Sequence, residues 1–306
     1  MKTLAMFPGQ GSQFVGMGKD LVDQFPYAKD VFEEAEDSAK IQIRKLCFDG
    51  PESDLRLTAN TQPSILAVSI ATWRVLVEEV GFKSTFFAGH SLGEYSALVC
   101  AGRLSFARAC YLVRKRGEAM QTAVPDGLGA MAAVMKLDVD TLKAHCKKVS
   151  TEDCYVEIAN FNSAQQLVVA GHAKAVEKLK TNLASEKARV TMLPVSAPFH
   201  SRLMAPAKLA MKELIEETEF QDNDNQMFAN VEGSIVNYSP QHLVDQIDSP
   251  VKWLQTMESS SEAEISRYVE VGPGKVLTGL GRRILPREGR TFLATDNIVD
   301  TVSALS

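Results

Sequence analysis

The stretch FFAGHSLGEY, residues 86–95, joins a strand-like apolar run directly to an amphipathic helix. Gly89 and Gly93 leave room for a sharp turn between the two elements, with Ser91 at its apex. A nucleophile elbow of this kind holds its serine in a strained backbone conformation and projects the hydroxyl oxygen into a cleft. The peptide N–H of Leu92, at the start of the helix, faces the same space. The stretch therefore predicts a catalytic serine; the alternative is a glycine-rich turn with a helix-capping serine.

The segments on either side of the elbow alternate between strand and helix patterns. Residues 4–7 predict a buried first strand, and residues 8–13 a loop at its carboxyl end, where open α/β sheets bind ligands. A helix is expected to begin at residues 61–64 with Pro63 in its first turn, and Ser105 is expected to cap the helix that carries Leu112, Arg116 and Met120, the next one after the elbow helix. Together these patterns predict an α/β fold.

The pattern of predicted strands and helices changes after residue 126, at a Pro-Asp-Gly turn. From there to residue 196 the predicted order is strand, helix, strand, strand, helix, strand, which suggests a ferredoxin-like subdomain inserted into a larger domain. The predicted organisation is a large domain built from residues 1–126 and 197–306, with residues 127–196 as the inserted small subdomain.

Composition restricts the class of protein. The chain has 306 residues, of which 45% are hydrophobic and 23% charged, with a formal net charge of −5 and both signs interspersed, so no nucleic-acid partner and no membrane surface is expected. Its five cysteines are scattered and form no C-x-x-C pair, so neither a disulfide framework nor a metal site is predicted. We expect an enzyme of the reducing cytoplasm.

Two further residues are candidates for the chemistry. Ser91 needs a base with a pKa near neutrality, which imidazole supplies. Among the five histidines, His200 differs by lying in the rigid loop of residues 196–201, where the large domain resumes, whereas His90 is expected to pack or hydrogen-bond. Arg116 shares a helix face with Leu112 and with Met120, so its guanidinium is expected to point inward and to meet a carboxylate.

The chain resembles the malonyl-CoA:acyl-carrier-protein transacylases in several motifs that follow the family's order. These are FPGQGSQ at residues 7–13, GHSLGEYSA at 89–97, RGEAMQ at 116–121, NFNS at 160–163, PFHS at 198–201 and EVGPGKVL at 270–277. The resemblance covers nearly the whole chain. It implies an α/β-hydrolase-like large domain with the ferredoxin-like insert, and an enzyme of bacterial type II fatty acid synthesis.

The resemblance also implies the role of each site residue. Ser91 attacks the malonyl thioester, His200 serves as general base and acid, and Arg116 pairs with the malonyl carboxylate. The backbone amides of Gln10 and of Leu92 form the oxyanion hole.

Phe199 is implied to crowd a branched acyl chain and so to favour malonyl over methylmalonyl. The family orients its histidine from a stretch that reads SPVKW here, residues 249–253, with Lys252 where the family has glutamine. Either a main-chain carbonyl makes that contact and Lys252 serves unchanged, or the side chain matters and His200 is held differently.

The expected reaction is a ping-pong transfer of malonyl from coenzyme A to the phosphopantetheine thiol of acyl carrier protein, through a malonyl-serine ester and without metal or cofactor. A monomer is expected. Two alternatives remain at this point: a serine hydrolase or thioesterase that shares the elbow, and a non-catalytic docking module for acyl carrier protein.

Overall fold

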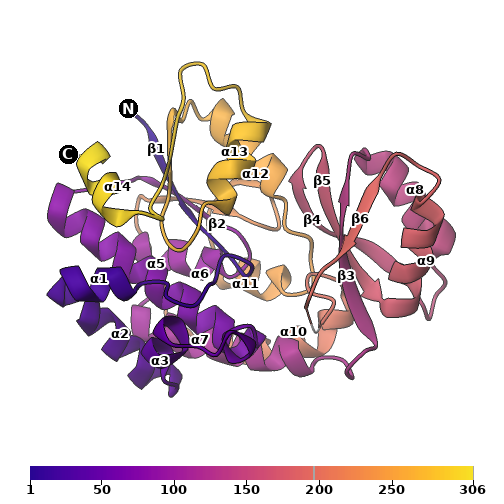
Figure 1. The fold of residues 1–306 in the computed structure, drawn as a ribbon, viewed down its shortest axis with the longest axis horizontal. Helices are drawn as coiled ribbons and strands as arrows, with labels where there is room; N and C mark the ends of the chain where they lie inside the picture. Colours follow the sequence, from indigo (N-terminus) through magenta and orange to yellow (C-terminus); the bar gives the residue numbers. More distant parts are fainter. Residues whose placement is uncertain (196, 306) are drawn as a thin grey trace.

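The computed structural model describes residues 1–195 and 197–305, and it contains two sheets (Figure 1). The larger sheet has the strand order β10-β9-β1-β2-β7-β8. Its first five strands run parallel, and β8 pairs antiparallel with β7 at the edge. The strands are β1 (Thr3–Phe7), β2 (Phe86–Gly89), β7 (Gln226–Ala229), β8 (Ser234–Val236), β9 (Arg267–Glu270) and β10 (Thr291–Ala294).

Strand β1 shows how the larger sheet is covered on both faces. Ala5 and Phe7 belong to the core formed with the N-terminal helices, whereas Leu4 and Met6 belong to a second core on the opposite face. All four side chains are fully buried, as expected for a central parallel strand. The helices of the first core include α1 (Lys19–Gln24), α2 (Pro26–Ala39), α3 (Ile43–Phe48), α4 (Glu52–Leu55), α5 (Thr58–Val80), α6 (Gly93–Cys100), α7 (Phe106–Thr122), α10 (Ala205–Glu216) and α11 (Pro240–Gln246).

The second core lies under the C-terminal helices α12 (Trp253–Glu262) and α13 (Val276–Ile284). The short η1 (Arg202–Met204) precedes α10, and α14 (Ile298–Leu305) ends the described chain near α5 (Figure 1). In the part of the chain that the structure describes, no helix is long and apolar enough to cross a membrane.

The smaller sheet is antiparallel and has the order β4-β5-β3-β6. Its elements follow the predicted sequence: β3 (Gly129–Met135), α8 (Val139–Val149), β4 (Val156–Ser163), β5 (Gln166–His172), α9 (Ala173–Leu183) and β6 (Arg189–Met192). The predicted α/β class with a small inserted strand-helix unit is thus confirmed. The limits 127–196 stay a prediction, and residue 196 itself lies outside the described residues.

A hydrogen-bonded β-bridge joins β4 of the smaller sheet to the segment before α12. In β4 the Phe161 N–H donates to the Val251 carbonyl at 2.9 Å, and the Val251 N–H donates to the Ala159 carbonyl at 2.9 Å. Edge strand β4 is therefore tied to the segment that enters α12.

The start of α5 differs from the sequence-based expectation. The helix begins at Thr58 rather than at residues 61–64, and Pro63 lies inside it. Proline has no N–H, so the carbonyl four residues earlier, that of Ala59, loses its helical partner. Arg114 on α7 donates to that carbonyl at 3.0 Å from Nη1, which explains how the helix accommodates Pro63.

Candidate active site

The elbow has the predicted geometry. Ser91 lies between the end of β2 and the start of α6 with a φ of +54°, a left-handed conformation that costs a non-glycine residue free energy. A Cβ at Gly89 would lie 1.9 Å from the Gly93 carbonyl carbon, and a Cβ at Gly93 would lie 2.0 Å from the Phe7 oxygen. Both glycines are therefore required for α6 to pack this close. The side-chain oxygen of Asn230 accepts from the Ser91 N–H at 2.7 Å and holds the strained turn.

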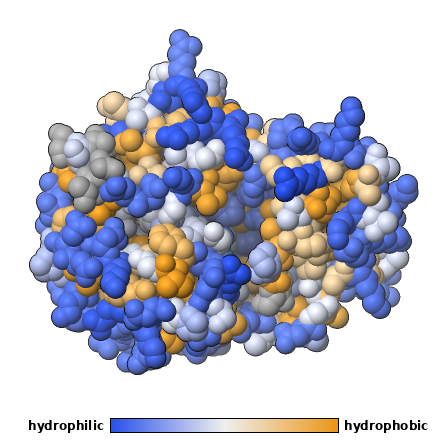
Figure 2. All heavy atoms as spheres, in the orientation of Figure 1, coloured by the Kyte–Doolittle hydropathy of each residue, from blue (hydrophilic) through white to orange (hydrophobic). Residues whose placement is uncertain are grey.

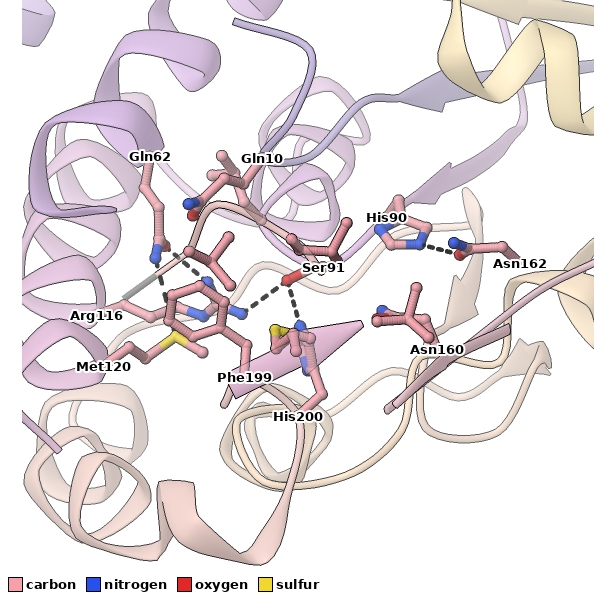
Figure 3. Close-up of a pocket in the computed structure, with 15 residues that line it drawn as sticks. Gln10, Gln62, His90, Ser91, Arg116, Met120, Asn160, Asn162, Phe199 and His200 are labelled. Atoms are coloured by element: carbon pink, nitrogen blue, oxygen red, sulfur yellow. Dashed lines mark hydrogen bonds between the residues drawn. The ribbon is translucent and has the colours of Figure 1, made fainter. Parts of the chain in front are cut away.

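The structure brings His200 to the serine (Figure 3). The Ser91 Oγ lies 2.7 Å from His200 Nε2, and His200 Nδ1 lies 2.9 Å from the main-chain oxygen of Gln246. A carbonyl can only accept, so Nδ1 carries the proton and the Nε2 lone pair faces the hydroxyl. Burial, and then the charge of Arg116, lower the pKa of His200 to about 3. The imidazole is therefore neutral at neutral pH, the form that can take a proton.

Lys252 does not orient His200, which corrects the expectation from the sequence. The carbonyl that orients His200 belongs to Gln246, the last residue of α11, and has no partner within its own helix. Lys252 is instead the N-cap residue of α12, and its N–H donates to the Asn230 carbonyl at 3.0 Å. The exchange of glutamine for lysine at this position therefore leaves the contact to His200 in place.

Arg116 is buried, as its helix face predicted, with 1% of its surface exposed. Its Nη1 donates to the Gln62 side-chain oxygen at 2.7 Å, and its Nη2 donates to Ser91 Oγ at 3.1 Å (Figure 3). Nη2 also donates to the Gln246 side-chain oxygen at 2.8 Å. All three acceptors are neutral, so the carboxylate partner expected from the sequence is not one of them. Within the described residues its Nε has no partner.

The remaining predicted residues line the same cavity, which has a volume of about 170 Å³. Gln10 and Leu92 lie at its wall beside Ser91, and Phe199 lies next to His200. Neither the Gln10 N–H nor the Leu92 N–H donates a hydrogen bond within the described chain. The molecular surface is hollowed between the large and the small part (Figure 2), and residues of both parts line the cavity.

Several polar residues around the cavity were given no role from the sequence. Gln62 and Gln246 bind the guanidinium, Asn230 holds the elbow, and Asn162 on β4 accepts from His90 Nε2 at 2.9 Å. Amides inside helices and strands look like ordinary polar positions in a sequence. For Asn162 a signal existed, since it lies in the NFNS motif. His90 is a hydrogen-bonding residue rather than the base, as predicted.

The comparisons with known proteins agree on one class. A family model described as an acyl transferase domain matches residues 6–291. The malonyl CoA-acyl carrier protein transacylase of Bacillus subtilis (strain 168) is 43% identical over 300 residues, which cover 96% of this chain and 94% of that relative. The malonyl CoA-acyl carrier protein transacylase of Escherichia coli (strain K12) is 40% identical over 287 residues, 92% of each chain.

A solved structure, FabD from Acinetobacter baumannii, matches with a TM-score of 0.94 at 39% identity and covers 99% of this chain and 98% of that one. This chain belongs to the malonyl CoA-acyl carrier protein transacylase family. A complex of a type II polyketide acyl-carrier protein with its malonyl-transacylase also matches, with a TM-score of 0.90 at 40% identity over 96% of this chain and 94% of that one.

Proposed function

We propose that this protein transfers a malonyl group from coenzyme A to the phosphopantetheine thiol of acyl carrier protein, through an ester on Ser91. The observation that carries the proposal is the convergence on one hydroxyl: Ser91 Oγ lies 2.7 Å from the base nitrogen of His200 and 3.1 Å from the guanidinium of Arg116. The first contact activates the oxygen. The second places a positive charge where the end of a short acyl group must lie.

The first half-reaction forms the ester and releases the thiol. Ser91 Oγ attacks the thioester carbonyl carbon while His200 Nε2 takes the hydroxyl proton. The free N–H groups of Gln10 and of Leu92 stabilise the oxyanion of the tetrahedral intermediate. When the intermediate collapses, the carbon–sulfur bond breaks, and the imidazolium of His200 returns the proton to the departing coenzyme A sulfur.

The second half-reaction reverses these steps with a different thiol. The phosphopantetheine thiol of the carrier gives its proton to His200 and attacks the Ser91 ester, and the serine leaves with the proton returned. The Gln246 carbonyl, at the negative end of α11, stabilises the imidazolium in both halves by accepting from Nδ1.

Arg116 explains the choice of a short diacid. In a malonyl ester, the free carboxylate is separated from the reacting carbonyl by a single methylene, so it must lie within a few ångströms of Ser91 Oγ, where the guanidinium is. A carboxylate there supplies the anionic partner that the neutral acceptors around Arg116 do not. An acyl group without it leaves a buried charge unpaired, at a cost on the order of 2–5 kcal/mol.

The location and the partners follow from the same assignment. The partners of this protein are malonyl-CoA and acyl carrier protein, which are also the partners that the names of its relatives state. All five cysteines are free thiols in the structure, which supports a reducing compartment, and we assign the protein to the cytoplasm.

Intact-mass measurement tests the proposed function. Incubation with malonyl-CoA is expected to add one malonyl group to the protein, and Ser91→Ala is expected to remain unmodified. The adduct is expected to disappear on addition of holo acyl carrier protein, which gains the same mass. A wild-type protein that never gains mass, with coenzyme A released or not, would falsify the assignment.

The same experiment separates the two alternatives. A hydrolase would release free malonate at a rate independent of carrier, and a docking module would bind the carrier without any adduct. Geometry disfavours the hydrolase triad, because His200 Nδ1 donates to a main-chain carbonyl where a triad has a carboxylate.

A further inference from the structure

A fully buried carboxylate lies directly beneath the elbow and has no part in the steps above. Glu94 is in the first turn of α6 and has no exposed surface. Its Oε1 accepts from the Tyr238 hydroxyl at 2.6 Å. Its Oε2 accepts from Gln246 Nε2 at 2.7 Å and from the Asn230 N–H at 3.2 Å. All three neighbours donate to the carboxylate, which fits the ionised form.

The contact between Glu94 and Gln246 fixes which way the Gln246 amide points. Its nitrogen donates both to Glu94 and to the main-chain oxygen of Ser91, the latter at 2.9 Å. Its side-chain oxygen is thereby turned to Arg116 Nη2. The opposite orientation would set the amide hydrogens against the guanidinium and the amide oxygen against the carboxylate, so it loses every one of these bonds.

Gln246 thus contacts each member of the reacting group. Its side chain binds the guanidinium of Arg116 and the main chain of Ser91, and its main-chain oxygen holds His200. Glu94 is the anion that sets this residue in place.

We propose that Glu94 is a positioning residue for acyl transfer, which locks the Gln246 side chain in the one orientation that holds Arg116, Ser91 and His200 together. The proposal rests on the proposed function, since it concerns the rate of Ser91 acylation. It acts without any contact between Glu94 and the substrate.

The charges around Glu94 make the proposal sensitive to pH. Burial raises the pKa of Glu94 to about 7, against the hydrogen bonds from Tyr238, Gln246 and Asn230 and the positive charge of Arg116. Tyr95 also faces it and stays protonated, because burial raises the pKa of its phenol to about 12. A protonated Glu94 is neutral and accepts a weaker hydrogen bond from the Gln246 amide, so Gln246 loses its anchoring charge as the pH falls.

The first test is the single-turnover rate constant for malonyl loading of Ser91 in Glu94→Gln. This rate constant does not depend on the fraction of active protein. It is expected to fall about 10- to 100-fold, the range for a misplaced catalytic group. Glu270→Gln is the matched control: it removes a carboxylate of equal burial that caps α13, away from the cavity, and is expected to leave the rate constant unchanged.

The second test asks whether the effect of Glu94→Gln on the loading rate constant depends on the Gln246 side chain. The variant Gln246→Ala keeps the main-chain carbonyl that holds His200 and removes only the amide. In this background Glu94→Gln is expected to lose most of its effect on the rate constant, because the group it orients is gone. A full additional fall in the double variant would overturn the proposal.

The third test is the pH profile, which a purely structural role would not move. In the wild type the loading rate is expected to decrease as the pH falls through about 7. His200 does not titrate there, since its pKa is lowered to about 3. This acidic limb of the pH–rate profile is expected to vanish in Glu94→Gln and to persist in Glu270→Gln.

Tyr238→Phe gives the same information without removing the carboxylate. It deletes a hydrogen bond that lowers the Glu94 pKa, so the limb is expected to shift to higher pH. The proposal is overturned if the acidic limb keeps its position in Tyr238→Phe. It is also overturned if the limb persists in Glu94→Gln. The proposed function survives either result as long as the wild type forms the adduct.

Discussion

At the scale of single residues, the site depends on a positive charge with no anionic hydrogen-bond partner. Arg116 donates to Gln62, Ser91 and Gln246, all of them neutral, and burial lowers its pKa from the ordinary value. Such a group is unfavourable in the empty protein and becomes favourable when an anion binds. The helix pattern predicted the burial of Arg116 but could not tell a carboxylate of the protein from one of the substrate; only the resemblance implied the malonyl carboxylate, and that pairing stays a prediction.

Replacing Arg116 by alanine is expected to reduce malonyl loading steeply while acetyl loading stays level or rises, because only malonyl loses a charged partner. The ratio of the two rate constants, measured by intact mass, checks this. Arg116→Lys keeps the charge but lacks the planar fork and is expected to recover only part of the malonyl rate. Equal losses for both acyl groups would make Arg116 a structural residue.

Replacing Phe199 by alanine is expected to widen the acyl side of the cavity, since Phe199 lines it beside His200 and is buried. Methylmalonyl loading should therefore rise relative to malonyl loading. Competition between the two coenzyme A esters measures the ratio. An unchanged ratio would show that selectivity against the branch comes from elsewhere.

At the scale of elements, the elbow shows what a sequence can predict. Strand, turn and helix were identifiable because Gly89 and Gly93 are required by close backbone approach, a local constraint that leaves a local signature. The helix start at Thr58 was missed because the compensation for Pro63 comes from Arg114, which is distant in sequence. Strands β8 and β10 were also missed, since three- and four-residue edge strands carry too little alternation to be recognised.

Gly93→Ala is expected to force α6 away from β1, because the new Cβ would meet main-chain atoms of Phe7 and of Pro8. We expect a loss of roughly 1–3 kcal/mol in the free energy of unfolding, typical of overpacking, together with slower Ser91 loading. Gly279→Ala on α13 is the control. Nothing lies within 4 Å of the position that its new Cβ would occupy, so it should stabilise by up to about 1 kcal/mol. Urea unfolding compares the two.

The cap of α13 gives a pH-dependent stability. Glu270 accepts from the Leu277 N–H at 3.0 Å and from the Thr278 N–H at 2.7 Å. Burial raises its pKa to about 7, above its ordinary value, although these bonds oppose the shift. A raised pKa in the folded state stabilises the protein at low pH and loses that effect as the pH rises through about 7.

The stability advantage of the wild type over Glu270→Gln should therefore shrink as the pH rises from below the ordinary glutamate pKa to above 7. Urea midpoints of both proteins across this range measure it. An advantage that grows with pH would mean that the helix N-terminus outweighs burial and keeps the carboxyl ionised throughout.

At the scale of the whole molecule, the site is assembled from both parts of the chain. Ser91 and Arg116 precede the small sheet, His200 and Gln246 follow it, and Asn160 and Asn162 of β4 reach the cavity from the small sheet itself (Figure 3). The insert was predictable because its periodicity differs from that of the flanking segments. The convergence of these segments on one cavity was not predictable, since it depends on packing between elements far apart in sequence.

The two parts also meet at the exposed surface. Arg283 on α13 donates to the Gln166 side-chain oxygen of β5 at 3.4 Å. We expect an acidic carrier protein to approach Ser91 over this surface, so Arg283→Glu is expected to raise the KM for carrier and leave the KM for malonyl-CoA unchanged. Lys178→Glu, on α9, is the control with the same change of charge. An equal rise in the KM for carrier in both variants would show that only the net charge of the protein matters.

The bridge between β4 and Val251 sets an axis for any relative motion of the two parts. Its two hydrogen bonds are both 2.9 Å long and lie at the β4 edge of the small sheet, a few residues along the chain from Gln246. A rotation that keeps them intact must turn about a line through Val251. In such a rotation β6, the strand farthest from β4, moves most, whereas Asn160 and Asn162 on β4 keep their place in the cavity wall, so the cavity can widen on the β6 side while β4 stays in place.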